Sequence, residues 1–244
     1  MHDTVQLLAL AAASFVAAFL SACFSVGGGY VLFGATTWIM PLPSAIALQS
    51  VFSMGSLLSR THAFWAEIEW PIVRTFTAGS VIGVTIGMWA FSHIPTGALA
   101  VLLAVLLWLL AWAPPLRAPL SAGKSFFAVG ILHAGLGALF GLGAILQPAL
   151  LRTALARTAI VGTFAACIIV LEVLRTGGYA ANGFSYLRYW PEIAVATVTG
   201  LAGTYSGKRV PPPISEPAFR LAMRIFVTLL GADILYRGIA PWLA

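Results

Sequence analysis

The stretch FSVGGGYVLFG, residues 24–34, places three consecutive glycines, Gly27, Gly28 and Gly29, between two strongly apolar runs. Adjacent glycines weaken a helix, because glycine has the greatest backbone freedom and no side chain to pack. A phosphate-binding loop would also need a lysine at a fixed spacing, and this stretch has none. The glycines therefore predict an interruption of a helix, and the solvent around the chain decides what that interruption can do.

The composition is that of a membrane protein. Of its 244 residues 60% are hydrophobic and only 8% are charged, and the mean hydropathy is +0.97. Soluble domains carry about 25% charged residues, and a helix needs about 20 apolar residues to cross a bilayer. The apolar runs lack the alternation of a membrane β-barrel. We therefore expect an all-α polytopic protein whose surroundings are the lipid bilayer, and we interpret the net charge of +6 as loop charge and not as a nucleic-acid patch.

Apolar runs of suitable length predict eight membrane-spanning helices. They cover residues 4–24, 44–60, 71–92, 97–113, 125–141, 154–175, 189–207 and 218–237. Two shorter apolar pieces, 30–40 and 144–152, are too short to cross a bilayer upright. The proline-rich stretch 114–124 indicates a linker between a first repeat, residues 1–113, and a second repeat, residues 125–244.

The two halves repeat the same motifs. The pair Trp70-Pro71 is followed by Gly83 and Gly87, and the pair Trp190-Pro191 is followed at the same spacing by Gly203 and Gly207. The start of the opening motif, FSVG at 24–27, corresponds to FGLG at 140–143. These echoes predict a duplication, and the two glycine pairs favour close helix packing.

Charge decides between parallel and inverted halves. If the glycine break reverses the chain direction, ten basic residues share one side of the membrane: Arg60, Arg74, Arg117, Lys124, Arg152, Arg157, Lys208, Arg209, Arg220 and Arg224. The other side then carries three: Arg175, Arg188 and Arg237. Because basic loops stay cytoplasmic, we expect two inverted repeats with both termini outside the cytoplasm. Each repeat is then a glycine-broken helical hairpin followed by three transmembrane helices.

Interrupted helices at matching places predict a substrate site. A helix that restarts within the membrane directs unpaired N–H groups and a partial positive charge toward the break, which suits an anion. The restarts fall at about 28–30 and 143–145, and neutral amides and hydroxyls occur nearby. The predicted substrate-binding residues are Gly27, Gly28, Gly29, Gln49, Ser50, Gly143, Gln147 and Thr163. Helix packing and helix-to-helix hydrogen bonds are the alternative roles for these residues.

Charged and ionisable residues within the spans have two interpretations each. Arg60, Arg152 and Arg157 lie near predicted cytoplasmic ends, where they orient the chain or form a cationic vestibule for anions. Glu172 is a candidate for proton coupling or for an ion pair with Arg175. His133 is a candidate for proton coupling or for structural burial. The sequence contains no recognised catalytic, metal-binding or cofactor motif, so we expect a protein that is not an enzyme and needs no metal or cofactor.

The same motifs resemble the sulfite exporter TauE/SafE family, also called the toluene-sulfonate uptake permeases. The resemblance rests on FSVGGGYVLFG and LPSAIALQS in the first half, and on GALFGLGAILQPAL and ARTAIVGTFAA in the second. It implies transport of a small sulfur-containing anion, such as sulfite, sulfoacetate or another organosulfonate, across the inner membrane.

The resemblance and the residues together predict a secondary transporter that works by alternating access, with proton coupling as a hypothesis. The alternatives are an anion channel, a non-transporting membrane assembly or receptor protein, and an intramembrane enzyme. A homodimer is compatible with each of these functions.

Overall fold

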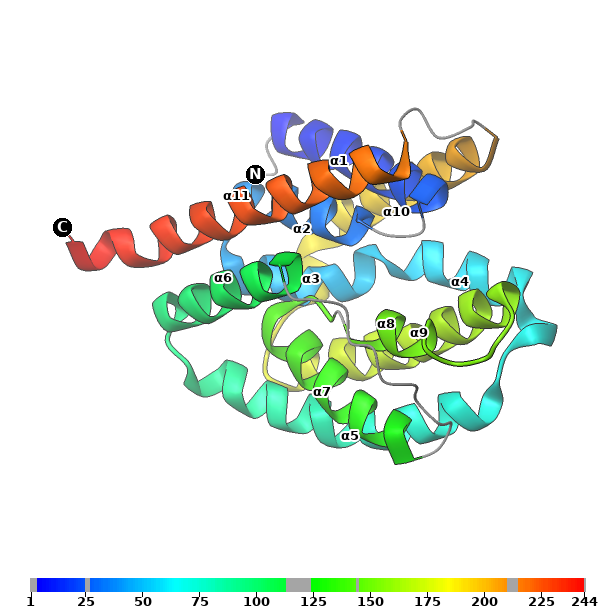
Figure 1. The fold of residues 1–244 in the computed structure, drawn as a ribbon. Coiled ribbons are helices and arrows are strands. Elements are labelled where there is room, and N and C mark those ends of the chain that lie inside the picture. The colour runs from blue at the N-terminus through cyan, green and yellow to red at the C-terminus, as the bar shows by residue number, and fades with distance from the viewer. Residues whose placement is uncertain (1–3, 25–26, 113–123, 144, 210–214, 244) are drawn as a thin grey trace. The chain divides into compact units, whose positions relative to one another are not determined.

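A computed structural model of the chain describes residues 4–24, 27–112, 124–143, 145–209 and 215–243, and every regular element within these ranges is helical (Figure 1). The elements in chain order are α1 (Thr4–Phe24), α2 (Gly28–Ile39), α3 (Leu42–Phe52), α4 (Met54–Ala63), η1 (Trp65–Glu67), α5 (Trp70–His93), α6 (Thr96–Trp112), α7 (Lys124–Phe140), α8 (Leu146–Leu150), α9 (Arg157–Ala181), η2 (Tyr186–Tyr189), α10 (Trp190–Arg209) and α11 (Glu216–Leu243). The predicted all-α class is confirmed.

The helices follow the predicted spans closely, with one informative exception. Helices α3 and α4 together cover the second predicted span, and the short helices α2 and α8 occupy the two apolar pieces that were too short to cross. The exception is α9, which continues through Gly177 and Gly178 to Ala181, past the predicted end at residue 175. Arg175 therefore lies inside a helix and not at its end.

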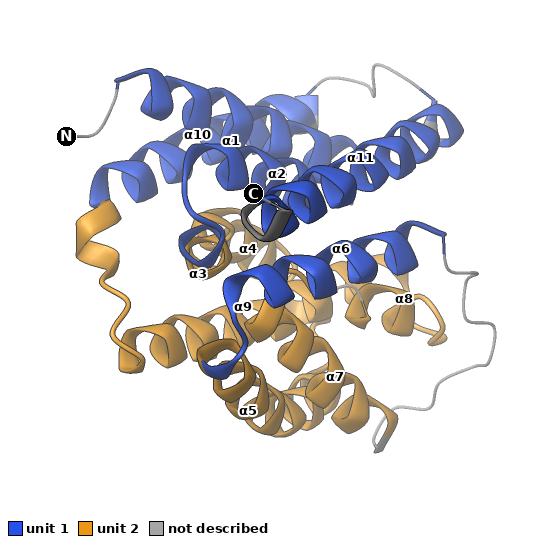
Figure 2. Cartoon of the chain, turned by 90° about the vertical axis from the view of Figure 1, so that its left-hand side faces the viewer, with its two compact units in different colours: residues 1–45, 93–114, 190–244 blue, residues 46–92, 115–189 orange. Residues whose placement is uncertain are grey.

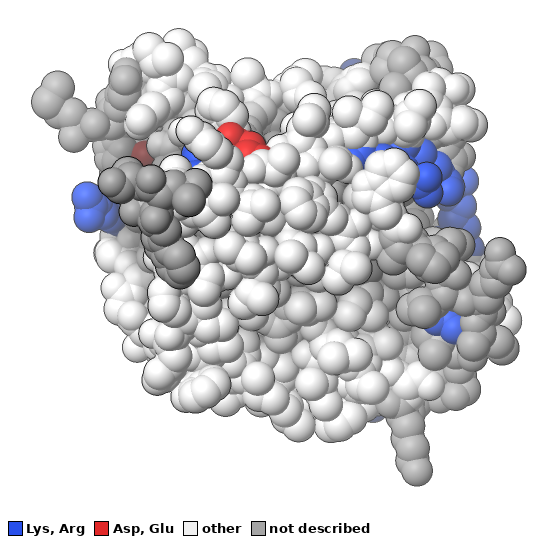
Figure 3. All heavy atoms as spheres, turned by 60° about the vertical axis from the view of Figure 1, so that its left-hand side comes forward, with Lys and Arg blue, Asp and Glu red and all other residues white. Residues whose placement is uncertain are grey.

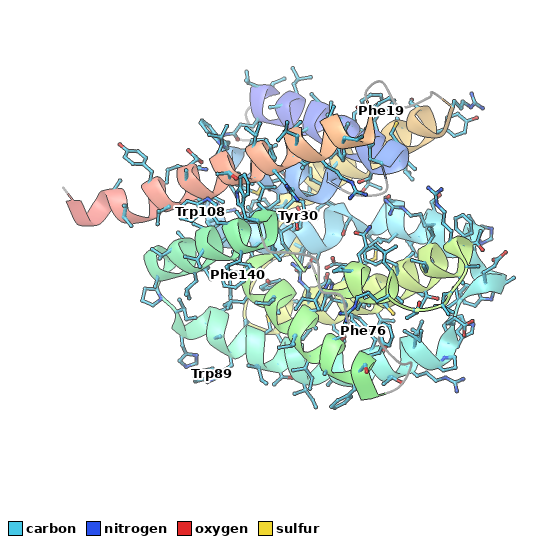
Figure 4. All side chains as sticks on the ribbon, viewed as in Figure 1. Phe19, Tyr30, Phe76, Trp89, Trp108 and Phe140 are labelled. Carbon is cyan, nitrogen blue, oxygen red and sulfur yellow. The ribbon has the colours of Figure 1, made fainter. Side chains whose placement is uncertain are left out.

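Within the described part of the chain, four helical stretches are long and apolar enough to cross a membrane: Thr4–Phe24, Leu42–Ala63, Trp70–His93 and Arg157–Ala181. Large apolar side chains are exposed on these and other helices, including Trp89, which is 65% exposed on α5 and points outward in Figure 4. Charged side chains are few on the face drawn in Figure 3. Because water would penalise such a surface, these helices fit a polytopic protein surrounded by lipid.

The chain forms two compact units, and each takes helices from both predicted repeats (Figure 2). Unit 1 comprises residues 1–45, 93–114 and 190–244, and unit 2 comprises residues 46–92 and 115–189. In unit 1, α6 lies along α11, where Trp108 donates a 3.0 Å hydrogen bond to the Thr228 carbonyl (Figure 4). The repeat boundaries at 113 and 125 describe duplication along the chain, and they stay a prediction.

The Trp-Pro helices pack through glycines in both units. In unit 1, a Cβ atom on Gly203 of α10 would lie 2.2 Å from the Phe15 carbonyl oxygen of α1. In unit 2, a Cβ atom on Gly83 of α5 would lie 2.3 Å from the Ile131 carbonyl oxygen of α7. Only glycine allows such close backbone approach, so the predicted packing role of these small residues is confirmed.

These two contacts occupy equivalent places in the sequence. Ile131 lies 116 residues after Phe15, and the glycines one turn further on repeat the pattern, with Gly207 against Phe19 and Gly87 against Gly135. The first arm of each hairpin therefore packs on the Trp-Pro helix of the other half. Such recurrence is what a duplicated chain predicts, while the inverted orientation of the halves stays a prediction.

Candidate functional site

The first glycine motif interrupts the helix, as its sequence predicts. Helix α1 ends at Phe24 and α2 begins at Gly28, with Gly27 between them at a positive φ of 93°. The Gly27 carbonyl accepts hydrogen bonds from the N–H groups of Tyr30 and Val31 at 3.0 and 3.2 Å, and these bonds start the new helix. A positive φ favours glycine, so Gly27 fixes the position of the break.

At the first break in unit 1, an aromatic ring lies beside Gly27, and the backbone of α1 together with the Ser21 hydroxyl lies beside Gly28. A Cβ atom on Gly27 would lie 2.8 Å from the Phe219 ring of α11, and that ring stacks on Phe24 with 3.8 Å between the centroids. A Cβ atom on Gly28 would lie 2.0 Å from the Ala17 carbonyl oxygen of α1. Gly28 is buried and Gly29 is exposed. Close packing of α2 on α1 therefore accounts for the glycine at position 28.

The second break, in unit 2, has a polar side chain at its centre. Helix α7 ends at Phe140, and Gly141 follows with a positive φ of 78°. Helix α8 begins at Leu146, where Nδ1 of His133 accepts hydrogen bonds from the N–H groups of Ile145 and Leu146 at 3.2 and 3.1 Å. The imidazole thus caps the restarting helix, since it satisfies donors that no helical carbonyl can reach.

The same imidazole packs against Gly143 of the break. A Cβ atom on Gly143 would lie 2.5 Å from the His133 ring, so glycine is needed for the ring to fit. Because Nδ1 accepts, a neutral ring carries its proton on Nε2. His133 is buried, as one of the two predicted interpretations requires, while proton coupling through it stays a prediction.

Ser50 is the buried member of a group of three hydroxyls in unit 2, whose other two members are half-buried. Its hydroxyl donates to the Ala47 carbonyl at 2.7 Å, accepts from Thr176 of α9 at 3.0 Å, and lies 3.5 Å from the Tyr186 hydroxyl of η2. Burial raises the pKa of Tyr186, so its hydroxyl remains a hydrogen-bond donor. Gln49, the neighbour of Ser50 on α3, is also buried. We call Ser50, Thr176 and Tyr186 the hydroxyl cluster.

The other predicted polar residues lie elsewhere in unit 2. Thr163 is fully buried on α9, where its hydroxyl accepts a 2.9 Å hydrogen bond from the Glu69 N–H and ties α9 to the start of α5. About 20 Å of helix separates it from Thr176, so Thr163 is not part of the hydroxyl cluster. Gln147 is half-buried on α8. The three glycines of the first break belong to unit 1.

The three arginines predicted as a vestibule also belong to unit 2. Arg60 on α4 donates a 3.0 Å hydrogen bond to the Ser56 hydroxyl one turn earlier. Arg152 is half-buried in the turn after α8, and Arg157 is exposed at the first residue of α9. Their grouping into a vestibule stays a prediction.

A buried ion pair is the feature that the sequence located least well. On α9, Nη1 of Arg175 donates to Oε2 of Glu172 at 2.6 Å, and Nη2 of Arg175 donates to the Ile46 carbonyl of α3 at 3.2 Å. Arg175 is 1% exposed and Glu172 is 6% exposed. The pairing of Glu172 with Arg175 was among the predicted alternatives, but the span was predicted to end at residue 175, so the depth of Arg175 was not predicted.

Comparison with known proteins gives one match. The family model described as Sulfite exporter TauE/SafE matches residues 10–234, which is nearly the whole chain. No curated protein and no solved structure matches the chain.

Proposed function

Because the chain belongs to the sulfite exporter TauE/SafE family, a family of membrane transporters, we propose that it is a secondary transporter for a small sulfur-containing anion. Sulfite, sulfoacetate and other organosulfonates are the candidate substrates. The proposed mechanism is alternating access, with the anion bound where helices are interrupted within the membrane.

The observation that carries this proposal is the pair of broken helices. Each half contains a glycine at positive φ followed by a short restarting helix, α2 after Gly27 and α8 after Gly141. Non-helical backbone at membrane depth is tolerated only inside protein or beside a water-filled cavity, and transporters commonly place their substrate there. The second break supports the proposal more strongly, because polar and charged side chains of the same unit surround it.

Flux measurements test the proposal. In proteoliposomes that contain the purified protein and unlabelled sulfite, we expect external labelled sulfite to accumulate by counterflow. Single-channel currents in a planar bilayer would instead indicate an anion channel, and absence of any flux would favour an assembly or receptor protein. Uptake driven by an acidic exterior alone would support proton coupling, and no response to that gradient would remove it.

The distribution of basic residues also bears on how the chain is oriented in its membrane. We propose the inner membrane as the location, with both termini outside the cytoplasm, because that orientation gathers the basic residues on the cytoplasmic side. Alkaline phosphatase fused after Ala244 should then be active, and the same enzyme fused after Arg117 should be inactive. The opposite pair of results would invert the orientation.

A further inference from the structure

Arg175 is a charged side chain held deep within a membrane-spanning helix. Residue 169 is the midpoint of α9, so Arg175 lies about 9 Å and Glu172 about 4.5 Å from the middle along the helix axis. Charged residues at such depth are costly, and they commonly mark the path of a substrate or ion. Helix packing alone therefore does not account for the Glu172–Arg175 ion pair.

The guanidinium of Arg175 has one unpaired hydrogen-bond donor among the described residues. Its Nη1 and Nη2 atoms donate to Glu172 and to the Ile46 carbonyl, while the buried Nε atom has no hydrogen-bond partner among the described residues. A buried donor left unpaired is unfavourable. A small oxyanion fits the planar fork of an arginine through two parallel hydrogen bonds, so it could use Nε together with a terminal nitrogen.

Neutral donors surround the same stretch of α3. Arg175 donates to the Ile46 carbonyl, the hydroxyls of Ser50 and Tyr186 both donate to the neighbouring Ala47 carbonyl, and Thr176 of α9 donates to Ser50. Hydroxyl groups can rotate to donate to another acceptor. The hydroxyl cluster and the guanidinium thus offer neutral donors and positive charge along about one turn of α3.

The second glycine break lies beside this cluster. A Cβ atom on Gly137 of α7 would lie 3.8 Å from Cδ of Arg175, and His133, one turn earlier on α7, caps the start of α8. His133 also lies within electrostatic range of Arg175. The cation and the helix restart are therefore parts of one region of unit 2.

We propose that Arg175 binds the transported anion directly, and that the Glu172 carboxylate is an internal competitor that occupies Arg175 until it takes up a proton. This inference rests on the proposed transport of a sulfur oxyanion and assigns its cationic ligand. Glu172 holds Nη1 and leaves the Nε edge open, but its negative charge neutralises the guanidinium and repels a second anion at that edge. Protonation removes the charge of Glu172 and frees Arg175, and therefore one proton binds with each anion.

The other ionisable groups near the pair are His133 on α7, Tyr179 on α9 and Tyr186 in η2, and the Ser53 hydroxyl faces Glu172. A pH dependence of anion binding could arise from any of these groups. The variant Glu172→Gln separates them, because it removes only the competing charge. Loss of the pH dependence in this variant would assign it to Glu172.

Methanesulfonate is the suitable probe, because a sulfonate stays fully ionised through the accessible pH range and any pH dependence must come from the protein. Its affinity is measured on the purified full chain by thermal shift between pH 5.5 and 8.5. In the wild type we expect affinity to fall about tenfold per pH unit where Glu172 is ionised in the free protein. Glu172→Gln should bind as tightly as the low-pH wild type at every pH, and the anion should restore its lost stability.

The double variant Glu172→Gln/Arg175→Gln should bind about 10- to 100-fold more weakly than Glu172→Gln, as expected for loss of charge-assisted hydrogen bonds. The matched control is Asp233→Asn/Arg237→Gln, which removes the part-exposed ion pair of α11 in unit 1 and should leave binding unchanged. If the double variant does not fold, the pH profile of Glu172→Gln decides alone.

Two results would overturn the inference: an unchanged pH dependence in Glu172→Gln, or equal affinity in a folded double variant. Both leave the proposed function standing, provided that the wild type binds and transports the anion. If the wild type neither binds nor transports sulfite or methanesulfonate, the proposed function itself fails.

Discussion

The two glycine breaks use the same backbone device in different chemical surroundings. In unit 1, Gly27 turns the chain against the ring of Phe219, and Gly28 packs on the backbone of α1. In unit 2, the turn at Gly141 leads to a helix start that His133 caps, and Arg175 of α9 packs against Gly137, one turn after His133 on α7. A glycine at positive φ thus forms each break, whereas the ionisable groups described here lie near the second.

This difference teaches that a glycine motif alone does not locate a binding site. Glycine is required at position 28 because a neighbouring helix comes close, and that requirement would exist without any ligand. Gly143 is required because a side chain of the protein occupies the space beside it. The chemistry of the neighbours, and not the number of glycines, points to unit 2 as the candidate anion site.

The largest expected effect is the removal of one partner from the buried ion pair. Arg175→Ala leaves the Glu172 carboxylate buried without its cation and should lower the free energy of unfolding by about 3–5 kcal/mol. Asp233→Asn, in the part-exposed pair of α11, should cost at most about 1 kcal/mol. Thermal unfolding in detergent measures both, and equal losses would contradict the importance of burial.

The next effect concerns the first break. Gly28→Ala places a methyl group against the backbone of α1, which cannot give way as a flexible side chain would. The resulting strain should cost about 1–3 kcal/mol or more. Gly177→Ala is the matched control on α9, where no atom lies within 4 Å of the added Cβ. That variant should be neutral or stabilising by up to about 1 kcal/mol. A Gly28→Ala variant as stable as this control would contradict the close packing of Gly28 against the backbone of α1.

A third comparison tests whether the two units pack alike. Gly83→Ala in unit 2 and Gly203→Ala in unit 1 bring a methyl group to nearly the same short distance from a backbone carbonyl. Each should therefore cost about 1–3 kcal/mol, and the two losses should agree within about 1 kcal/mol. Thermal unfolding of both variants in detergent measures the two losses of stability. A loss of stability confined to one variant would argue against equivalent helix pairs.

The smallest expected effect concerns the cap of the second break. His133→Ala frees the N–H groups of Ile145 and Leu146 and should cost about 1–2 kcal/mol. If these amides can receive an anion, sulfite should stabilise His133→Ala more than it stabilises the wild type, because the internal acceptor has been removed. Thermal shifts at matched sulfite concentrations measure this difference. Equal shifts in the variant and the wild type would show that the α8 amides take no part in anion binding.

Sequence alone predicted the helices and the breaks well, because span length and hydropathy are properties of each segment by itself. It did not predict that α1 packs on α10 and α5 on α7, because helices in lipid select partners by the fit of small residues. The capping by His133 depends on how α7 and α8 meet. The depth of Arg175 was missed because its span was predicted to end at residue 175, whereas α9 continues through Gly177 and Gly178 to Ala181. Glycines inside a packed membrane helix are well tolerated.

We expect the transported anion to bind in unit 2, at the guanidinium of Arg175. Selenite is a heavier analogue of sulfite, and its selenium can be located by anomalous diffraction from crystals grown at concentrations that saturate transport. We expect an anomalous peak within about 4 Å of the Arg175 guanidinium nitrogens, so that a selenite oxygen lies at hydrogen-bond distance from them. A peak at another place in the chain, or no peak under these conditions, would contradict it.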